Sequence, residues 1–542
     1  MPRDTKPADW SGDDEIKKRE RKAYWQTGWA TGPDTVMGAV WATGLIAAAA
    51  SDSYCWPSGG LSSGADGATC TDIEDWNQTL FTDVGGESCS DEDVFGVPRY
   101  YHDPDKAGCM AAFAAYRAVT AYTCNCSGYN SPHAFLGSDS KGFRPSIIYT
   151  QAFAIGVLIV AIMQFFIGTF SDFSQRRLKV WWIMTFFLFG GTMGMAVVGP
   201  GSVWVIGLIF SVLTIIFSEI SLPIRAQYME DVSDDLATAG YLGAMRQVTS
   251  YVSQLLFAII YTGLTLVGLK DWTISTIMAV AASVWFIIFM SLILRKFTEH
   301  GAKRTNDTGK GLCSVVMSET CADIASLKKY PEACKLLALS SILQVGGPVI
   351  VAISAAYATD YLQMPPFLYG LVVLMVLLMG APAAYLLAKM RKNDTLSFRA
   401  AWAIDISLFF LISVVIPLTA NSPDAKSWYI TIALAGMLGG IALSWFYSLG
   451  WASFSMLIPE QHVGSYAGIF QAINTIFAFI GPQIYVVVVQ ASSSHVLGWA
   501  TTAIWVVIAF IILFFIDFEK GFNDTHPSKA TVVDPSHAAS VA

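Results

Sequence analysis

The chain has 542 residues, of which 54% are apolar and 14% are charged, with a net charge of −8 and a mean hydropathy of +0.50. A soluble protein carries about 25% charged residues, so this composition excludes an ordinary soluble domain and indicates a membrane protein. The negative charge is spread over tails and loops and leaves no basic face for nucleic acid.

Residues 1–25 form a hydrophilic N-terminal tail that becomes basic just before the first apolar run. A cleaved signal peptide has a short apolar core followed by small residues at the cleavage site. That pattern is not found in the tail, so we expect the first span to act as an uncleaved anchor. The basic residues of the tail are Lys17, Lys18, Arg19, Arg21 and Lys22.

Twelve apolar segments follow, each close to the length that a membrane-crossing helix requires. A bilayer core of about 30 Å needs about 20 mostly apolar residues per helix. The segments are 26–50, 146–171, 178–198, 203–226, 239–266, 273–294, 334–358, 367–388, 399–419, 428–454, 465–490 and 497–517. We predict an all-α membrane protein with twelve transmembrane helices in two six-helix pseudo-repeats. The halves are 26–294 and 334–517, joined by a cytoplasmic linker, 295–333, and followed by a cytoplasmic tail, 518–542.

The distribution of lysine and arginine predicts the orientation, because cytoplasmic loops are rich in these residues. If the N-terminus is cytoplasmic, the basic loops after the second, sixth and eighth spans are cytoplasmic too. The opposite short loops hold almost nothing basic beyond Lys270 and Lys426. We therefore predict that both termini are cytoplasmic.

The long segment 51–145 after the first span is then a non-cytoplasmic loop. It holds six cysteines, an even number that allows fifteen pairings. Disulfides persist in oxidising compartments, which agrees with this orientation. The Cys124-Asn125-Cys126 spacing is too tight for a usual zinc site, and His102 and His133 lie in no cluster. We predict disulfides among all six and glycans at two sequons on the same side. These residues are Cys55, Cys70, Cys89, Cys109, Cys124, Cys126, Asn77 and Asn125.

The linker contains a further helical pattern over 312–330, where apolar and polar residues alternate at helical spacing. Two interpretations stay open: an amphipathic helix on the membrane surface, or an ordinary linker helix. Cys313, Cys321 and Cys334 lie in or near the cytoplasmic linker, and we expect them to be free thiols.

A charge cluster marks the loop between the second and third spans, formed by Gly168, Asp172, Arg176 and Arg177. The glycine permits close approach of helices, and the two guanidiniums follow the carboxylate by about one helical turn. Such a cluster can lock one helix pair against another and release it when the halves rock. The matching loop of the second half has Lys389 where the acid would be, so the two repeats differ in this charge cluster.

In the second short loop of a twelve-span protein, this cluster resembles the signature loop of the major facilitator superfamily. Further segments are WQTGWA at 25–30, LKKYP at 327–331, LIPE at 457–460, GSYAG at 464–468 and FIDFEKG at 515–521. Together they resemble the branch that contains the autophagy-related vacuolar amino-acid effluxers and their bacterial relatives. The resemblance implies amino-acid transport across a vacuolar or lysosomal membrane.

The chain departs from that branch at three places. The acidic residue usual in the first span is replaced by Gly28 or Gly32, with Asp34 the nearest substitute. An Asn-Asp pair usual in the seventh span is replaced by QVGG at 344–347, and a basic residue usual in the tenth falls near Trp451. Despite these departures we expect the same fold, but the sequence does not determine the substrate.

Three charged residues inside the spans define the candidate site: Asp34, Glu219 and Arg246. A charge at the bilayer centre costs about 2.5–3.5 kcal/mol on insertion scales and is a functional candidate by default. At a rise of about 1.5 Å per residue, all three lie about 10–12 Å from the cytoplasmic side. We predict a shared site for substrate and proton coupling. The alternative is a structural ion pair between Glu219 and Arg246.

Other polar residues in the spans have different expected roles. Arg225 lies near the interface, so we expect it to reach the headgroups and act structurally. Asp405 lies on a peripheral helix and is expected to balance Lys389 or Arg391. The second half adds further candidate substrate contacts, which are Gln344, Tyr447, Gln471 and Asn474.

The sequence contains no loop that could hydrolyse ATP, because Arg304 stands where the leading glycine before Gly309-Lys310 is required. Uphill transport must therefore use a gradient, and one pH unit supplies about 1.36 kcal/mol. We predict a non-enzymatic secondary transporter of small solutes, without cofactor or metal, coupled to protons or driven by a gradient. Amino-acid efflux from a vacuole-like or lysosome-like compartment is the leading version. The alternatives are another metabolite (sugar, peptide or organic ion) at the plasma membrane, or a transporter-like receptor or scaffold that binds a partner through 51–145.

Overall fold

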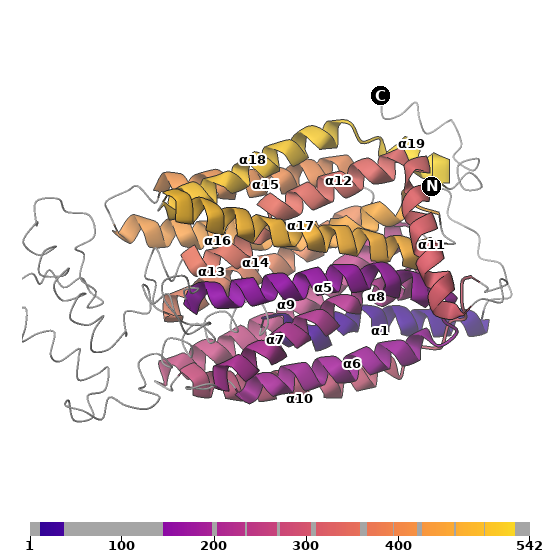
Figure 1. Ribbon diagram of the computed structural model, residues 1–542, viewed down its shortest axis with the longest axis horizontal. Coiled ribbons are helices and arrows are strands. Elements are labelled where there is room, and N and C mark those ends of the chain that lie inside the picture. Colours follow the sequence, from indigo (N-terminus) through magenta and orange to yellow (C-terminus); the bar gives the residue numbers. More distant parts are fainter. Residues whose placement is uncertain are drawn as a thin grey trace, which may run out of the picture.

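The computed structural model describes residues 11–36, 145–197, 203–233, 236–267, 271–304, 311–357, 366–393, 395–419, 425–459, 462–492 and 494–525. Within this part of the chain every regular element is a helix, and most of the helices run side by side in one bundle (Figure 1). The predicted disulfides and glycosylation sites lie outside the described residues, as does nearly all of the predicted loop that carries them.

The helices fall into the two predicted halves. The first half contains α1 (Ser11–Val36), α5 (Pro145–Phe173), α6 (Arg177–Gly194), α7 (Val203–Ile220), α8 (Leu222–Val232), α9 (Leu236–Leu266) and α10 (Asp271–Leu294). The second half contains α12 (Pro331–Gly346), α13 (Val349–Ala356), α14 (Pro366–Lys392), α15 (Phe398–Thr419), α16 (Ala425–Ser455), α17 (Val463–Ser492) and α18 (His495–Phe514). Two shorter helices are α11 (Leu312–Ser326), between the halves, and α19 (Phe518–Thr525). The 3₁₀ turns η2 (Met195–Val197) and η3 (Leu327–Lys329) extend α6 and α11.

Nine helices of the described residues are long and apolar enough to cross a membrane. Large apolar side chains such as Ile155, Phe186 and Ile288 are exposed on them, as expected for surfaces that face lipid. The total of twelve spans stays a prediction. The helix that holds the start of the first predicted span begins much earlier than that span, at Ser11, because the intervening Glu, Lys and Arg residues are good helix formers.

Two of the predicted spans are each divided into two helices. The fourth is α7 and α8, separated at Ser221, and Pro223 lies in the first turn of α8, where its missing N–H costs nothing. The seventh is α12 and α13, separated at Gly347 and Pro348, because proline cannot donate a helical hydrogen bond to continue α12. Hydropathy alone does not reveal these breaks.

The most extensive contacts between the halves run along two helix pairs, α5 with α17 and α9 with α14, and α9 with α16 and α8 with α17 add smaller ones. Glycine allows the first pair to approach closely: a Cβ on Gly168 would lie 2.4 Å from the carbonyl oxygen of Gly464 and 2.7 Å from Cα of Gly468. In the second pair, a Cβ on Gly380 would lie 3.0 Å from the Tyr251 ring. Small residues at helix contacts are typical of membrane bundles.

Glycine also determines how α1 packs on α9. A Cβ on Gly28 would lie 2.0 Å from the carbonyl oxygen of Arg246, and one on Gly32 would lie 2.0 Å from Oγ of Ser253. The two helices therefore meet backbone to backbone. An acidic side chain would not fit at either glycine, which gives a physical reason for one departure from the resembled branch.

Asp405 of α15 does not balance Lys389 or Arg391, which corrects one prediction. Its side chain is 0% exposed, and neither carboxylate oxygen has a hydrogen-bond partner among the described residues. Arg391 lies over the Phe398 ring at 3.7 Å and donates to the carbonyl of Leu396. That local stacking arrangement keeps the guanidinium at the end of α14.

Candidate functional site

Glu219 lies in the last turn of α7, where the helix breaks before α8. Its backbone carbonyl accepts a hydrogen bond of 3.0 Å from Nε2 of Gln164 in α5. Its carboxylate has no hydrogen bond or ion pair with any described residue, although it lies near enough to two arginines to be influenced by their charges. Glu219 is half-buried and therefore remains available to a ligand or a proton.

Arg246 of α9 is half-buried as well, and its Nε is enclosed without a partner. No described residue forms a hydrogen bond or ion pair with its side chain. The alternative prediction, a structural ion pair with Glu219, is therefore wrong. The carboxylate and the guanidinium influence each other without forming an ion pair.

Arg225 of α8 is the largest correction to the predicted site. It does not reach toward the interface but is 5% exposed. One terminal nitrogen donates to the carbonyl of Ser218 at 2.8 Å and to the hydroxyl of Ser221 at 2.6 Å, while Nε has no partner. These contacts hold the guanidinium inside the protein, and counting residues along the span does not reveal them.

Side chains from other helices complete this region. Tyr24 of α1 is buried and is influenced by the charges of both Arg225 and Arg246. Tyr447 of α16, in the other half, lies near enough to Glu219 to be influenced by its charge, yet is 54% exposed. We call Glu219, Arg225 and Arg246 the central charge cluster.

The structure places the remaining predicted site residues in different surroundings. Asp34 belongs to α1, but its side chain lies outside the described residues. Gln344 and Gln471 are half-buried, with no hydrogen bond to a described residue. The amide oxygen of Asn474 accepts hydrogen bonds from Ser340 and Ser341 of α12, at 3.0 and 3.3 Å. Asn474 thus ties α17 to α12.

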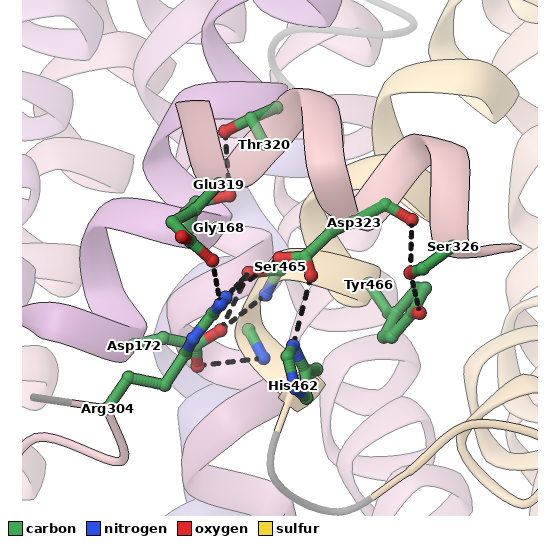
Figure 2. Close-up of polar contacts among 12 residues, drawn as sticks. Gly168, Asp172, Arg304, Glu319, Thr320, Asp323, Ser326, His462, Ser465 and Tyr466 are labelled. Carbon is green, nitrogen blue, oxygen red and sulfur yellow. Dashed lines mark hydrogen bonds and ion pairs between the residues drawn. The ribbon is translucent and has the colours of Figure 1, made fainter. Parts of the chain in front are cut away.

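The predicted gating cluster lies at the end of the bundle crossed by α11, which we call the linker end (Figure 1). Asp172 of α5 accepts hydrogen bonds from the backbone N–H groups of Gly464 (3.1 Å) and Ser465 (2.8 Å) at the start of α17. The Ser465 hydroxyl (2.9 Å) and Nε2 of Gln227 (2.6 Å) also donate to it (Figure 2). A helix N-terminus favours a negative charge, so Asp172 caps a helix of the opposite half.

Neither arginine of the gating cluster forms a hydrogen bond or ion pair with Asp172 among the described residues. Arg176 is exposed, whereas Arg177 is buried and donates to the Asp231 carboxylate at 2.9 Å and the Gly301 carbonyl at 2.8 Å. Its guanidinium also lies 5.7 Å from the centre of the Tyr228 ring. Arg177 therefore fixes the start of the linker against the first half, and Asp172 joins the halves.

Sequence reasoning missed the network that α11 forms across the linker end. Arg304 donates to Asp323 at 2.8 Å and also pairs with Glu319, and the other Asp323 oxygen contacts Nδ1 of His462 at 3.0 Å (Figure 2). Burial would raise the pKa of the Asp323 carboxyl, but the hydrogen bond with His462 and the charge of Arg304 outweigh it and lower that pKa. These residues are far apart in sequence, so no spacing motif could have shown their contact.

Two hydroxyl contacts attach α11 to both halves. Thr320 donates to Oγ1 of Thr169 in α5 at 2.8 Å, and Ser326 lies 2.7 Å from the Tyr466 hydroxyl of α17 (Figure 2). The apolar side of α11, including Val315, is buried against the protein. The helical spacing of Thr320 and Asp323 was the available signal for this contact face. Cys313, Cys321 and Cys334 are free thiols, as predicted.

Comparisons with known proteins identify the family. The model of the Major Facilitator Superfamily matches residues 119–482. The structure is similar to the human organic anion transporter MFSD10 (TETRAN), with a TM-score of 0.51, 10% identity, and 92% and 99% of the two chains covered. It is also similar to the proton:xylose symporter XylE bound to 6-bromo-6-deoxy-D-glucose, with a TM-score of 0.55, 12% identity, and 95% and 99% covered. No relative was found among curated proteins.

The match covers more than half of the chain, so the protein belongs to the major facilitator superfamily. It is a multi-pass membrane protein and a secondary transporter of small solutes, not an enzyme. The low identity of the solved structures means that their likeness concerns the fold alone. The substrate must be argued from the central charge cluster.

Proposed function

We propose that this transporter moves a small zwitterionic solute, with export of amino acids from a vacuole-like or lysosome-like compartment as the leading version. The sequence resemblance to the autophagy-related effluxer branch supports this direction and membrane. Wherever its compartment is acidic, a proton gradient is available to drive export. Both termini are then cytoplasmic, and the linker end faces the cytoplasm.

One observation carries the proposal: within the part of the chain that the structure describes, the side chains of Glu219 and Arg246 have no hydrogen-bond or ion-pair partner, although their charges influence each other. A buried charge without a partner is expensive, so proteins retain one where a ligand supplies the partner. An acid and a base in one region match the ammonium and the carboxylate of an amino acid. Glu219 can also carry the coupled proton, since it forms no ion pair that would hold it ionised.

The gating cluster supplies the conformational step in this proposal. Asp172 and the α11 network hold the linker end together, and their release would open the site toward the cytoplasm. Alternating access in such transporters is a rocking of one half against the other around a fixed site. Asp34, Gln344, Gln471 and Asn474 remain proposed contacts of the solute or the proton.

A proteoliposome assay with an imposed pH gradient tests the proposal. The full chain should move radiolabelled neutral amino acids, and Glu219→Gln and Arg246→Ala should each abolish most of that flux. Two exposed residues whose side chains form no hydrogen bond or ion pair with a described residue serve as matched controls, Glu15→Gln and Arg295→Gln, which should transport normally. Flux at the wild-type level in Glu219→Gln and Arg246→Ala would remove the site assignment.

Two other functions remain as alternatives. Another small metabolite at the plasma membrane would appear in the same vesicles as flux of a sugar, peptide or organic ion without flux of amino acids. A receptor or scaffold that uses 51–145 to bind a partner would show no solute flux. It would also lose its partner when that segment is replaced in the full-length protein.

A further inference from the structure

We propose that Arg225 and Arg246 together form an anion subsite that binds the carboxylate of the transported solute. This inference rests on the proposed function and deepens it, because it identifies one chemical group that the cargo must carry. It also adds Arg225, which the sequence assigns to the membrane interface, as a specificity-determining residue.

The first argument is the balance of charge. The central charge cluster contains two guanidiniums and one carboxylate, so it carries an excess positive charge even when Glu219 is ionised. Arg225 and Arg246 also influence each other, and like charges in a low-dielectric interior repel. An anion between them would relieve this repulsion.

The second argument is that nearby acids are already occupied. Asp231, on the same helix as Arg225, pairs with Arg177 at 2.9 Å and with Lys303 at 3.0 Å. Glu20, on the same helix as Tyr24, accepts hydrogen bonds from the backbone N–H and hydroxyl of Thr298. Among the described residues, the cluster therefore has Glu219 as its one acidic neighbour, and Glu219 forms no ion pair with either arginine.

The third argument is that N–H donors of the two arginines are available for an anion, and that those of Arg225 are already held in place. Ser218 and Ser221, at the break between α7 and α8, hold one terminal nitrogen of Arg225 and so fix the plane of its guanidinium. Its Nε has no partner among the described residues, and neither does any nitrogen of the Arg246 side chain. The Arg246 guanidinium, whose nitrogens have no partner among the described residues, can present two N–H groups to the two oxygens of a carboxylate, and Arg225 can add a single N–H. Fixing the donors beforehand reduces the entropy lost on binding.

The proposal restricts the cargo. A solute held by these arginines carries a carboxylate or, with the same donor chemistry, a phosphate. A neutral sugar would leave two guanidiniums unpaired, and a purely cationic solute would be repelled. Glu219 is then left for the ammonium group of a zwitterion or for a proton.

The test measures binding separately from transport. The full-length protein is placed in nanodiscs of uncharged lipid, and its thermal unfolding is followed during titration with sodium acetate, sodium phosphate or methylammonium chloride, at constant ionic strength set with sodium chloride. We expect acetate to raise the unfolding temperature with a saturable midpoint and methylammonium to have no such effect. A lower midpoint for phosphate than for acetate would instead assign the subsite to a phosphate group.

Variants decide whether the arginines cause the effect. Arg225→Gln and Arg246→Gln should each raise the acetate midpoint by about tenfold or more, since a hydrogen bond to a charged group is lost. Glu219→Gln should lower that midpoint, because a repelling charge is removed. Arg295→Gln, at an exposed arginine, should leave the midpoint unchanged. If Arg225→Gln does not fold, Arg225→Lys replaces it. This variant keeps the charge but loses the planar guanidinium, and it should raise the acetate midpoint by less than is expected for Arg225→Gln.

Equal acetate midpoints in the wild type, Arg246→Gln and Arg295→Gln would overturn the subsite. Saturable, arginine-dependent binding without flux in proteoliposomes would keep the subsite but contradict the proposed transport of amino acids. Amino-acid flux whose KM is unchanged in Arg225→Lys and Arg246→Gln would support the proposed transport of amino acids but contradict the subsite.

Discussion

The linker end and the central charge cluster use the same residue types in opposite ways. At the linker end, Asp172, Arg177 and Arg304 each have several protein partners. In the central charge cluster, Glu219 and Arg246 have none among the described residues. In the proposed mechanism, the charges with several protein partners hold a conformation, and the charges without such partners bind the solute. The number of protein partners then distinguishes these two proposed roles.

The largest expected effect follows from Arg246→Ala. Transport should fall by about 10- to 100-fold, the equivalent of one lost hydrogen bond to a charged group. The unfolding free energy should change by no more than about 0.5 kcal/mol, because no native side-chain hydrogen bond is lost. Initial flux rates and unfolding temperatures of the same preparation measure both. A large loss of stability with normal transport would reverse the comparison between the two regions.

Asp172→Asn, at the linker end, should reduce stability, whereas Arg246→Ala should leave it almost unchanged. An asparagine amide nitrogen would face backbone N–H groups that Asp172 now satisfies, at a cost of about 1–3 kcal/mol of stability. The unfolding temperature should fall, and accessibility of an introduced cysteine near Gly464 should increase. Arg176→Gln, at an exposed residue of the same loop, is the matched control. Unchanged stability in Asp172→Asn would argue against a latch between the halves.

Thr320→Val tests the attachment of α11 at lower energy. The substitution keeps the shape of the side chain and removes its hydroxyl bond to Thr169, which should cost about 1 kcal/mol. Ser318→Ala, on the exposed side of the same helix, should cost almost nothing. Thermal unfolding compares the pair, and equal values would show that α11 is not held through this contact.

The smallest effect concerns pH. The hydrogen bond to Glu20 raises the pKa of His300 against the opposing effect of burial. Burial would raise the pKa of Glu20, but hydrogen bonds from His300 and Thr298 outweigh it and lower that pKa. The His300 contribution is therefore present below its ordinary pKa and lost as pH rises through the raised value. The Glu20 contribution is present above its ordinary pKa and lost as pH falls through the lowered value.

Stability should thus decrease as pH is raised from about 6 to about 9, and the decrease should be weaker in His300→Gln. The effect should stay below about 1 kcal/mol, because the imidazole is partly exposed. Unfolding temperatures across that range provide the measurement. An identical pH profile in His300→Gln would assign the change to other groups.

Much of the helical framework was accessible from the sequence, because hydropathy has a direct relation to helix length in a bilayer. The ends of α10 and α15, for example, lie within a few residues of the predicted ranges. The burial of Arg225 was not accessible, since it depends on how the side chains and backbone around it are placed. Hydropathy also did not show the break at Ser221, for which Pro223 was the available signal.

The candidate site could also be predicted only in part from the sequence. Charge in an apolar segment identified Glu219 and Arg246, because the cost of an intramembrane charge is a property of the residue alone. Their lack of partners could not be predicted, since it depends on where every neighbouring side chain points. The contact of His462 with Asp323 likewise joins residues 139 positions apart, and no local pattern encodes it.

The close approach of α1 and α9 also constrains how this chain can evolve. Restoring an acidic residue at Gly28 would place new atoms against the backbone of Arg246, so a single substitution cannot recover that acid without moving α9. Such a movement would shift Arg246 itself. An acidic side chain at Gly28 and the present position of Arg246 are therefore mutually exclusive in this packing.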